Sequence, residues 1–382
     1  MRTITAGDAV DMPFIHENAN WPQFGWSNDV LSPVLAALRY REGQLIGRMQ
    51  DLGFALRQEA SLNTLTDDVV KSSAIEGENL NREEVRSSIA RRLGMDVGGL
   101  IASNRDVEGI VEMMLDATQR FAEPLTDERL FGWHAALFPT GRSSMQRIAV
   151  GDWRPKEAGP MQVVSGPYGR EKVHFEAPTA DRLQSEMAKF LKWFNAPPSI
   201  DPVLRAGVAH FWFVTIHPFE DGNGRVARAI ADMSLARADG SKDRFYSMSA
   251  QIEAEKRDYY DRLEAQQRNG LDITPWLSWF LDCLSRALER AEATLEAVLY
   301  KAKLWDKAIR YIVNQRQRLV IERMLEDDWE GYLNTSKYAK LAKCSTDTAL
   351  RDIRELLQAG VLLQNAGGGR STSYRLAGAG EL

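Results

Sequence analysis

The chain has 382 residues, of which 44% are hydrophobic and 26% are charged, and this composition excludes a disordered protein. At about 150 residues a domain, the length predicts two or three domains. The formal net charge of −5 excludes a protein covered by nucleic acid over its whole surface. Two cysteines cannot form a disulfide scaffold, and no run of about 18 apolar residues is present to cross a membrane. We therefore expect a cytoplasmic protein with no membrane partner.

The N-terminal region, residues 1–100, is predicted to be an aromatic-rich arm followed by helices. Residues 1–25 have no helical or strand periodicity, whereas from Asp29 onward apolar residues recur every three or four positions. Gly77 ends the second helical stretch. Asn81 stands three residues before a glutamate, which is a typical start for a third helix.

Residues 101–300 are predicted to form a helical core that contains one β-hairpin. Two β-prone runs, 161–164 and 172–175, flank the turn-forming residues 165–170. Residues 273–308 form one amphipathic stretch, which we interpret as a connecting helix. Helical spacing is also found at residues 106–120, 127–137, 179–194 and 201–216.

The last region, residues 301–382, has the pattern of three helices followed by a hairpin, which is the order of a winged helix-turn-helix. Residues 333–376 contain seven basic and three acidic side chains, a local charge of +4. Arg351 and Arg354 lie on the candidate recognition helix and Arg370 lies at the predicted wing tip. This pattern predicts at most weak, salt-sensitive DNA binding. Docking of a protein, or of a second copy of the chain as a homodimer, is the alternative.

The segment 217–228, His-Pro-Phe-Glu-Asp-Gly-Asn-Gly-Arg-Val-Ala-Arg, contains the residues best suited to chemistry. It joins an apolar helical run, 203–216, to a second helix-forming run, 226–236. The glycines therefore lie at a helix N-terminus, where free N–H groups and the positive end of the helix dipole favour an anion. Gly222 and Gly224 allow the backbone to approach a phosphate closely.

The charged residues of this segment complete a nucleotide site. Arg225 and Arg228 are three residues apart, so both can meet phosphate oxygens. Asp221 offers one carboxylate, which suits a Mg²⁺ ion that takes its other ligands from phosphates and water. His217 can accept a proton. Each of these features taken singly is more often explained by a structural role than by a functional one. Six residue types suited to phosphate, metal or proton chemistry within twelve positions nevertheless favour a site for a magnesium nucleotide beside a base.

The segment matches every specified position of the Fic family signature, His-x-Phe-x-Asp/Glu-Gly-Asn-Gly-Arg-x-x-Arg, and the chain resembles that family over residues 15–300. The resemblance implies a mainly α-helical core with a β-hairpin flap, and transfer of AMP from ATP to a Ser, Thr or Tyr hydroxyl of a target protein. The resemblance implies that His217 is the base, that Phe219 is a packing residue and that Asp221 is the ligand of Mg²⁺ or Mn²⁺. It implies an anion hole formed by Gly222, Asn223 and Gly224. It also implies that the outer phosphates are bound by Arg225 and Arg228, and that the nucleotide-binding segment includes Val226 and Ala227.

A second motif lies upstream, where Ser72, Glu76 and Gly77 resemble the Fic inhibitory motif Ser/Thr-x-x-x-Glu-Gly/Asn. The spacing of four residues puts Ser72 and Glu76 on one face of a helix. The resemblance implies that Glu76 pairs with Arg228 and blocks the γ-phosphate site, so that ATP binds only in an unproductive pose.

Several functional alternatives stay open at this point. Glu76 could instead act as the base that hydrolyses AMP from a modified protein, or a different phosphate-containing group could be transferred. A third alternative is a DNA-binding regulator whose core only senses nucleotide.

The resemblance also implies that the flap, residues 161–175, holds the unknown target protein by strand addition. One departure is Glu255, near which related proteins often have an asparagine close to the nucleotide base.

Overall fold

The computed structural model describes residues 14–381 with the exception of 51, 96–99, 144, 167–169, 171, 312, 326–328 and 367–371. The chain divides into two compact units, residues 1–291 and 292–382. The predicted N-terminal region and helical core both belong to the first unit, and the predicted division of the chain into three parts stays a prediction.

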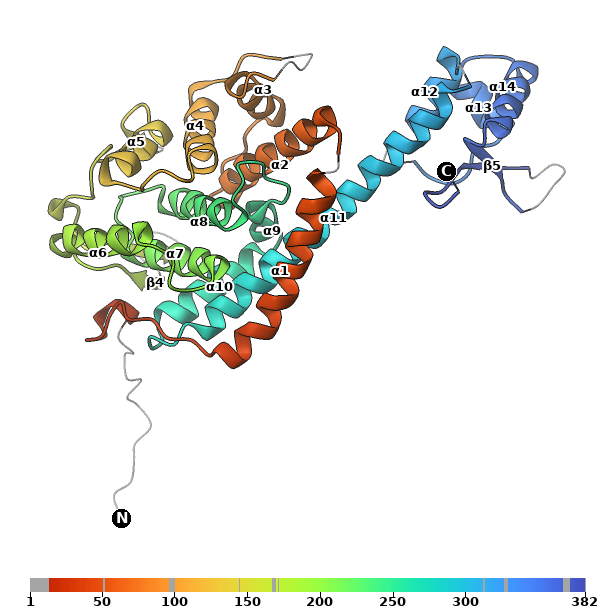
Figure 1. Ribbon diagram of the computed structural model, residues 1–382. Helices are drawn as coiled ribbons and strands as arrows, with labels where there is room; N and C mark the ends of the chain where they lie inside the picture. Colours follow the sequence, from red (N-terminus) through yellow and green to blue (C-terminus); the bar gives the residue numbers. More distant parts are fainter. Residues whose placement is uncertain are drawn as a thin grey trace. The chain divides into compact units, whose positions relative to one another are not determined.

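The first unit is built mainly of α-helices (Figure 1), which confirms the predicted mainly α-helical class for this part of the chain. Three short 3-10 helices, Ile15–Glu17, Lys156–Ala158 and Ala180–Arg182, lie between the longer elements. In chain order the α-helices are α1 (Asn28–Gln50), α2 (Phe54–Ile75), α3 (Arg82–Arg92), α4 (Arg105–Gln119), α5 (Asp127–Leu137), α6 (Leu183–Asn195), α7 (Pro202–Ile216), α8 (Asn223–Asp239), α9 (Met248–Ala254), α10 (Lys256–Gln267) and the first part of α11 (Thr274–Ile309).

In the described part of this unit, two antiparallel hairpins interrupt the helices. The strands β3 (Gln162–Ser165) and β4 (Lys172–Glu176) form the predicted hairpin, with an irregularity between Val163 and Val164. Part of its predicted turn lies outside the described residues. The smaller hairpin, of β1 (Arg142–Ser143) and β2 (Gln146–Arg147), was not predicted, because two-residue strands carry no periodicity.

Helices α7 and α8 form the centre of the first unit and pack against each other. Every residue of α7 from Val203 to Ile216 is buried, as expected of a helix that is apolar on all sides. Helix α8 also contacts α2, α4 and α5 (Figure 1). The loop that joins α7 to α8 is the motif segment, so the fold holds this loop between two of its most buried helices.

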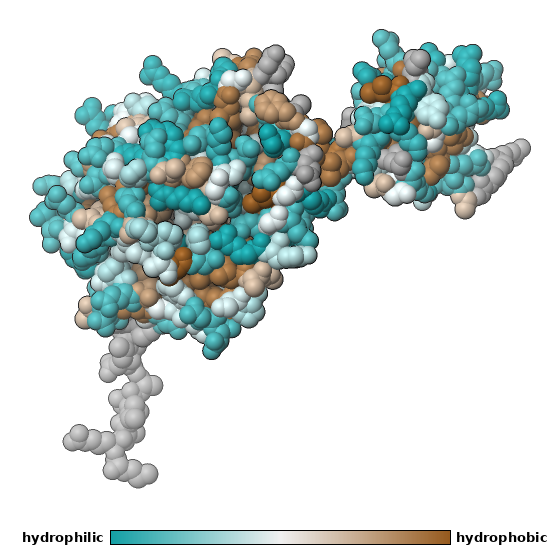
Figure 2. All heavy atoms as spheres, in the orientation of Figure 1, coloured by the Kyte–Doolittle hydropathy of each residue, from teal (hydrophilic) through white to brown (hydrophobic). Residues whose placement is uncertain are grey.

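The surface of the first unit is mostly hydrophilic on the face drawn in Figure 2, and apolar residues appear there in small patches. Among the helices that the structure describes, none is both long enough and apolar enough to cross a bilayer.

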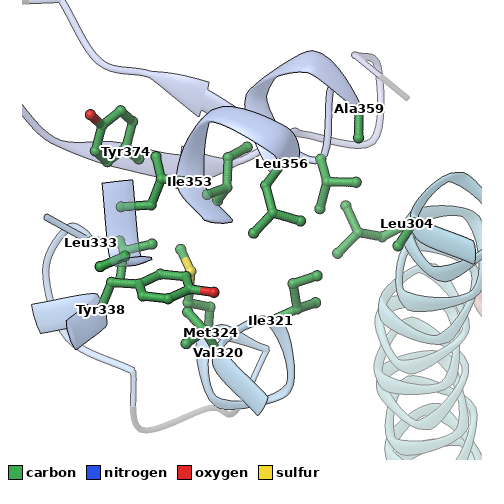
Figure 3. Close-up of a cluster of buried hydrophobic side chains, with 14 residues drawn as sticks. Leu304, Val320, Ile321, Met324, Leu333, Tyr338, Ile353, Leu356, Ala359 and Tyr374 are labelled. Atoms are coloured by element: carbon green, nitrogen blue, oxygen red, sulfur yellow. The ribbon is translucent and has the colours of Figure 1, made fainter. Parts of the chain in front are cut away.

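The second unit has the predicted order of three helices and a hairpin. It contains the end of α11, then α12 (Gln315–Met324), α13 (Thr335–Leu341), α14 (Thr346–Gln358), and the antiparallel strands β5 (Leu362–Gln364) and β6 (Tyr374–Leu376). Figure 3 shows its core, in which side chains from all four helices and both strands meet. Assignment as a winged helix stays a prediction, and the predicted wing tip with Arg370 lies outside the described residues.

Two features of this unit were not evident from the sequence. Leu304 and Ala308 of α11 are fully buried in its core, so the end of the connecting helix is part of the unit. Asp352 is buried, accepting hydrogen bonds from Arg316 and from the Tyr338 hydroxyl. This carboxylate therefore does not oppose the exposed Arg351 and Arg354 at the surface.

Candidate active site

His217 ends helix α7 in a left-handed conformation, with φ of 53°. Its backbone N–H still donates to Phe213 O at 3.0 Å, and its Nδ1 lies 3.2 Å from Val214 O. Because a carbonyl can only accept, we assign the ring proton to Nδ1. This tautomer leaves Nε2 with a free lone pair, as a general base requires.

The imidazole of His217 is partly exposed, and it lies among the residues that line a cavity. The pKa of His217 is lowered to about 4, chiefly because removal from bulk water disfavours the charged ring. The hydrogen bond to Val214 O opposes this shift, the Arg154 guanidinium adds to it, and Glu76 and Asp221 oppose it. His217 is therefore neutral at pH 7. The sequence predicts a histidine that can accept a proton, and its surroundings make this one a weaker base that is unprotonated at neutral pH.

The loop after His217 is closed by the side chain of Asn223. Its Oδ1 accepts from Phe219 N–H at 3.0 Å, and its Nδ2 donates to Phe219 O at 2.8 Å. Phe219 is fully buried and stacks on His134, with ring centroids 4.1 Å apart. The Asn223 side chain thus shapes the loop. His134 also lies 3.2 Å from Asp221 O and was not found from the sequence, because it comes from the distant helix α5.

The Asp221 carboxylate lies at the entrance to helix α8. One oxygen accepts from Gly222 N–H at 2.6 Å and the other accepts from the Ser143 hydroxyl. Among the described residues, no group of three or more His, Cys, Asp or Glu side chains is placed to hold a metal ion. One carboxylate beside a phosphate site does fit Mg²⁺, which commonly binds one or two carboxylates together with substrate phosphates and water.

The first turn of α8 is shaped for an anion. Gly222 caps this helix with φ of 80°, and a Cβ there would lie 2.9 Å from the Phe138 ring. A Cβ on Gly224 would overlap the Glu76 carboxylate and lie 3.2 Å from Arg228 Nη1. Glycine is therefore required at both positions, and at Gly224 it admits a negatively charged oxygen to the helix N-terminus.

Both arginines of the motif are buried and already engage carboxylates of the N-terminal region. Arg228 donates to the Ser72 hydroxyl at 2.9 Å, to Ser72 O at 2.8 Å and to Glu76 Oε1 at 2.7 Å. Arg225 donates to Glu78 Oε2 at 2.7 Å. Among the described residues, Arg225 Nε and Arg228 Nη1 find no hydrogen-bond partner although they are buried.

Glu76 and Glu78 owe their positions to the way helix α2 ends. Gly77 has φ of 86°, its N–H donates to Ala74 O, and the Glu78 N–H donates to Ser73 O. This pair of bonds is a Schellman motif, which needs a residue in the left-handed conformation and so favours glycine. The turn directs the carboxylates on either side of Gly77 to different arginines. Glu78 was missed from the sequence because it lies outside the inhibitory motif.

A cavity of about 560 Å³ opens beside these groups. Its lining comes from the end of α2, the hairpin strands, the end of α7, the start of α8 and helix α10. It includes Glu76, His217 and Gly224, so the base and the helix N-terminus face one space. The other lining residues are Val163, Val164, Ser165, His174, Phe175, Val214, Tyr259, Tyr260, Asp261, Leu263, Glu264 and Gln267.

Three residues considered for the nucleotide site from the sequence lie away from this space. Val226 and Ala227 are fully buried in α8, and the Val226 N–H is already bonded to Gly222 O, so their side chains serve the core. Glu255 is held by Arg286, with contacts of 2.5 and 2.6 Å. It therefore has a structural partner, and it is not among the residues that line the cavity.

Comparison with known proteins shows that the part of the chain around this site is similar to a known family. Residues 124–235 match the model of the Fic/DOC family, and residues 14–95 match a domain of unknown function, DUF4172. The chain contains a Fic domain. The match covers α5 through most of α8, including the flap and the motif loop.

Curated relatives of this Fic domain are named protein adenylyltransferases. The chain is 28% identical over 226 residues to Protein adenylyltransferase Fic of Culex quinquefasciatus, covering 58% of this chain and 40% of that protein. It is 30% identical over 172 residues to Protein adenylyltransferase fic-1 of Caenorhabditis elegans, covering 44% of this chain and 31% of that protein. The chain thus spans less than half the length of these relatives.

A solved structure with the same fold is a Fic family protein from Desulfovibrio desulfuricans G20. Its TM-score is 0.51 at 22% identity, and the alignment covers 91% of this chain and 96% of that chain. At this identity the likeness concerns the fold alone.

Proposed function

We propose that this protein is an autoinhibited adenylyltransferase, which transfers AMP from ATP to a hydroxyl side chain of a target protein and releases pyrophosphate. The observation that carries the proposal is the cavity lined by both His217, whose Nε2 has no hydrogen-bond partner among the described residues, and Gly224 at the N-terminus of α8, beside two buried arginines. The names of the curated relatives support the same activity.

The chemistry follows from these groups. A hydroxyl is a poor nucleophile at neutral pH, so His217 Nε2 takes its proton as the oxygen bonds to the α-phosphorus. The bond from that phosphorus to the β-phosphate oxygen breaks, and pyrophosphate leaves. Arg225, Arg228 and the N–H groups of the α8 N-terminus hold the phosphates and offset their charge. A Mg²⁺ or Mn²⁺ ion on Asp221 would supply further charge neutralisation when bound.

Autoinhibition is supported by the carboxylates that these arginines hold. Glu76 lies where a Cβ of Gly224 would be, against the first turn of α8. It therefore competes with a phosphate for both the helix N-terminus and Arg228. Glu78 competes in the same way for Arg225. Release of both carboxylates would free the outer phosphate sites.

The flap is the proposed docking site for the target protein. Arg268 donates to Val173 O and His174 O, at 2.8 and 3.0 Å, which occupies the outer edge of β4. All four residues of β3 are exposed, including Val163 and Val164. An extended target segment would therefore pair with the edge of β3, beside the cavity that contains His217.

The proposal is tested with ATP labelled at the α-phosphate. Purified wild type, Glu76→Gly and Glu76→Gly/His217→Ala are incubated with Mg²⁺ and a cell extract, and label on protein is measured. We expect strong labelling from the α-phosphate with Glu76→Gly alone, and no labelling from the γ-phosphate above that of the extract by itself. Labelling from the γ-phosphate above that background, or no α-labelling by any variant, would contradict AMP transfer.

Hydrolysis of AMP from a modified protein is the second candidate, because Glu76 lies in the same cavity as His217. Protein labelled by Glu76→Gly is freed of ATP and mixed with wild type or with Glu76→Gln. Loss of label only with wild type would favour the hydrolase. If the label is stable in both mixtures, the hydrolase is contradicted and the role of Glu76 is inhibition.

A further inference from the structure

Arg154 is a buried cation beside the active site that belongs to no motif of the sequence. The residue is 3% exposed, although it lies in a loop between the two hairpins. Nε donates to His217 O at 2.9 Å, Nη2 donates to Pro178 O, and the backbone N–H donates to Pro218 O at 2.9 Å. Its partners are thus backbone carbonyls, and no carboxylate of the described residues pairs with it.

The hydrogen bonds of Arg154 reach His217 and Pro218 at the point where the backbone of His217 has an unfavourable positive φ. Apart from glycines, His217 is one of two described residues with a positive φ. Its carbonyl lies at the C-terminus of α7, where the partial negative charge of the helix dipole favours a cation. Arg154 supplies that cation and bonds the carbonyls of both His217 and Pro218, which fixes the direction in which the imidazole leaves the backbone.

Arg154 also joins this point to the flap. Pro178 follows the end of β4 by two residues, and Arg154 itself precedes β3 by eight. One side chain therefore connects the segment before the flap, the segment after it and the loop that carries His217. Any displacement of the flap base changes the position of a side chain that holds the His217 carbonyl.

We propose that Arg154 is a positioning residue that holds His217 in its reactive orientation and couples it to the base of the flap. The proposal rests on the function proposed above, in which the flap binds the target and His217 takes the hydroxyl proton. Arg154 touches neither ligand in this arrangement and acts through the His217 backbone.

The same residue affects the charge state of His217. The charged groups that face His217 are Arg154 from the pre-flap loop, Glu76 from the end of α2 and Asp221 from its own loop. Tyr259, Tyr260, Asp261, Glu264 and His174 line the same cavity. Of the three nearest groups, Arg154 alone is a cation, so its loss favours protonation of His217.

The test uses the full chain with Glu76→Gly as parent, to which Arg154→Gln or Arg154→Lys is added. Glutamine removes the charge, and lysine keeps the charge but cannot reach both side-chain acceptors. Arg142→Gln is the control, because Arg142 is an exposed arginine on β1. We expect Arg154→Gln to lower kcat about 100-fold, the cost of a small misplacement of a reacting group, while KM for ATP and the control stay unchanged.

A second readout needs no substrate. The chain has five histidines, and nitrogen-15 NMR follows each imidazole through a pH titration, with His217→Ala assigning the resonance. We expect the pKa of His217 to rise in Arg154→Gln and to stay unchanged in Arg154→Lys, with kcat lowered in both.

The outcomes separate the two proposals. If the parent transfers no AMP, the proposed function fails, whereas the titration still tests the effect of Arg154 on His217. If Arg154→Gln unfolds, the lysine variant decides, because full kcat in Arg154→Lys overturns the coupling of His217 to the flap base. An unchanged kcat and an unchanged His217 titration in a folded Arg154→Gln overturn the inference.

Discussion

Removal of the Glu76 carboxylate should activate AMP transfer far more than removal of the Glu78 carboxylate. The side chains of Arg228 and Glu76 are 2% and 29% exposed, whereas those of Arg225 and Glu78 are 5% and 49% exposed. A hydrogen bond to a charged group in a buried setting contributes about 1.5–3 kcal/mol. At about 1.4 kcal/mol for each factor of ten, Glu76→Gly should raise transfer about 10- to 150-fold. A half-exposed ion pair contributes about 0.2–1 kcal/mol, so Glu78→Ala should raise it about fivefold at most.

The assay is incorporation of α-labelled AMP at an ATP concentration below KM, where a released phosphate site has its full effect. Wild type, Glu76→Gly, Glu78→Ala and the double variant are compared at equal protein concentration. Glu59→Ala is the matched control, because Glu59 lies on α2, the helix that ends directly before Glu76, and pairs with Arg86 at an exposure of 46%, similar to that of Glu78. The control removes an ion pair of α2 but leaves the motif arginines untouched, so its rate should equal that of wild type.

Equal activation by Glu76→Gly and Glu78→Ala would refute the reasoning from burial. Activation by Glu59→Ala would show that loosening of α2, rather than release of an arginine, controls the rate. A rate that is unchanged in all variants would remove the inhibitory role from both carboxylates.

Four further outcomes follow from the site. His217→Ala in the activated variant should abolish transfer but keep ATP affinity within about threefold in a calorimetric titration, because the phosphate contacts lie elsewhere; near-normal transfer would remove the base assignment. Since the pKa of His217 is lowered to about 4, this base stays unprotonated above pH 5. The value of kcat/KM should therefore not fall as the pH is lowered through 6.5. A fall in kcat/KM with its midpoint near pH 6.5 would contradict the lowered pKa of this imidazole. Asp221→Ala should lower the Mg²⁺-dependent rate about 100-fold or more, and full activity in chelator would exclude a metal. In the full chain, Arg351→Glu/Arg354→Glu should weaken any binding of duplex DNA at low salt, as measured by an anisotropy titration, and should leave AMP transfer unchanged. If neither the wild type nor the double variant changes the anisotropy of the DNA, the DNA role is excluded.

The sequence predicted most of the helices, although not α9 and α10, because helical periodicity is a local property. The apolar run of α7, the Asn81 cap of α3 and the two β-prone runs of the flap all correspond to elements of the structure. The motif loop could be located for the same reason, since glycines between two helix-forming runs mark a helix N-terminus wherever they occur. Helix α8 starts at Asn223, three residues earlier than the pattern of helix-forming residues indicates. The hydrogen bonds between the Asn223 side chain and Phe219, rather than hydrophobic spacing, set this start.

The partners of the site residues depend on contacts between distant segments. Glu78 reaches Arg225 across 147 residues of sequence, and Arg154 reaches His217 across 63. No periodicity links such pairs, so an exposed glutamate and a loop arginine look like any others in the sequence. Residue types and their spacing therefore determined which loop carries the chemistry. Tertiary packing alone decided which carboxylates occupy its arginines and how far burial lowers the pKa of its histidine, because both depend on what surrounds a charge in space.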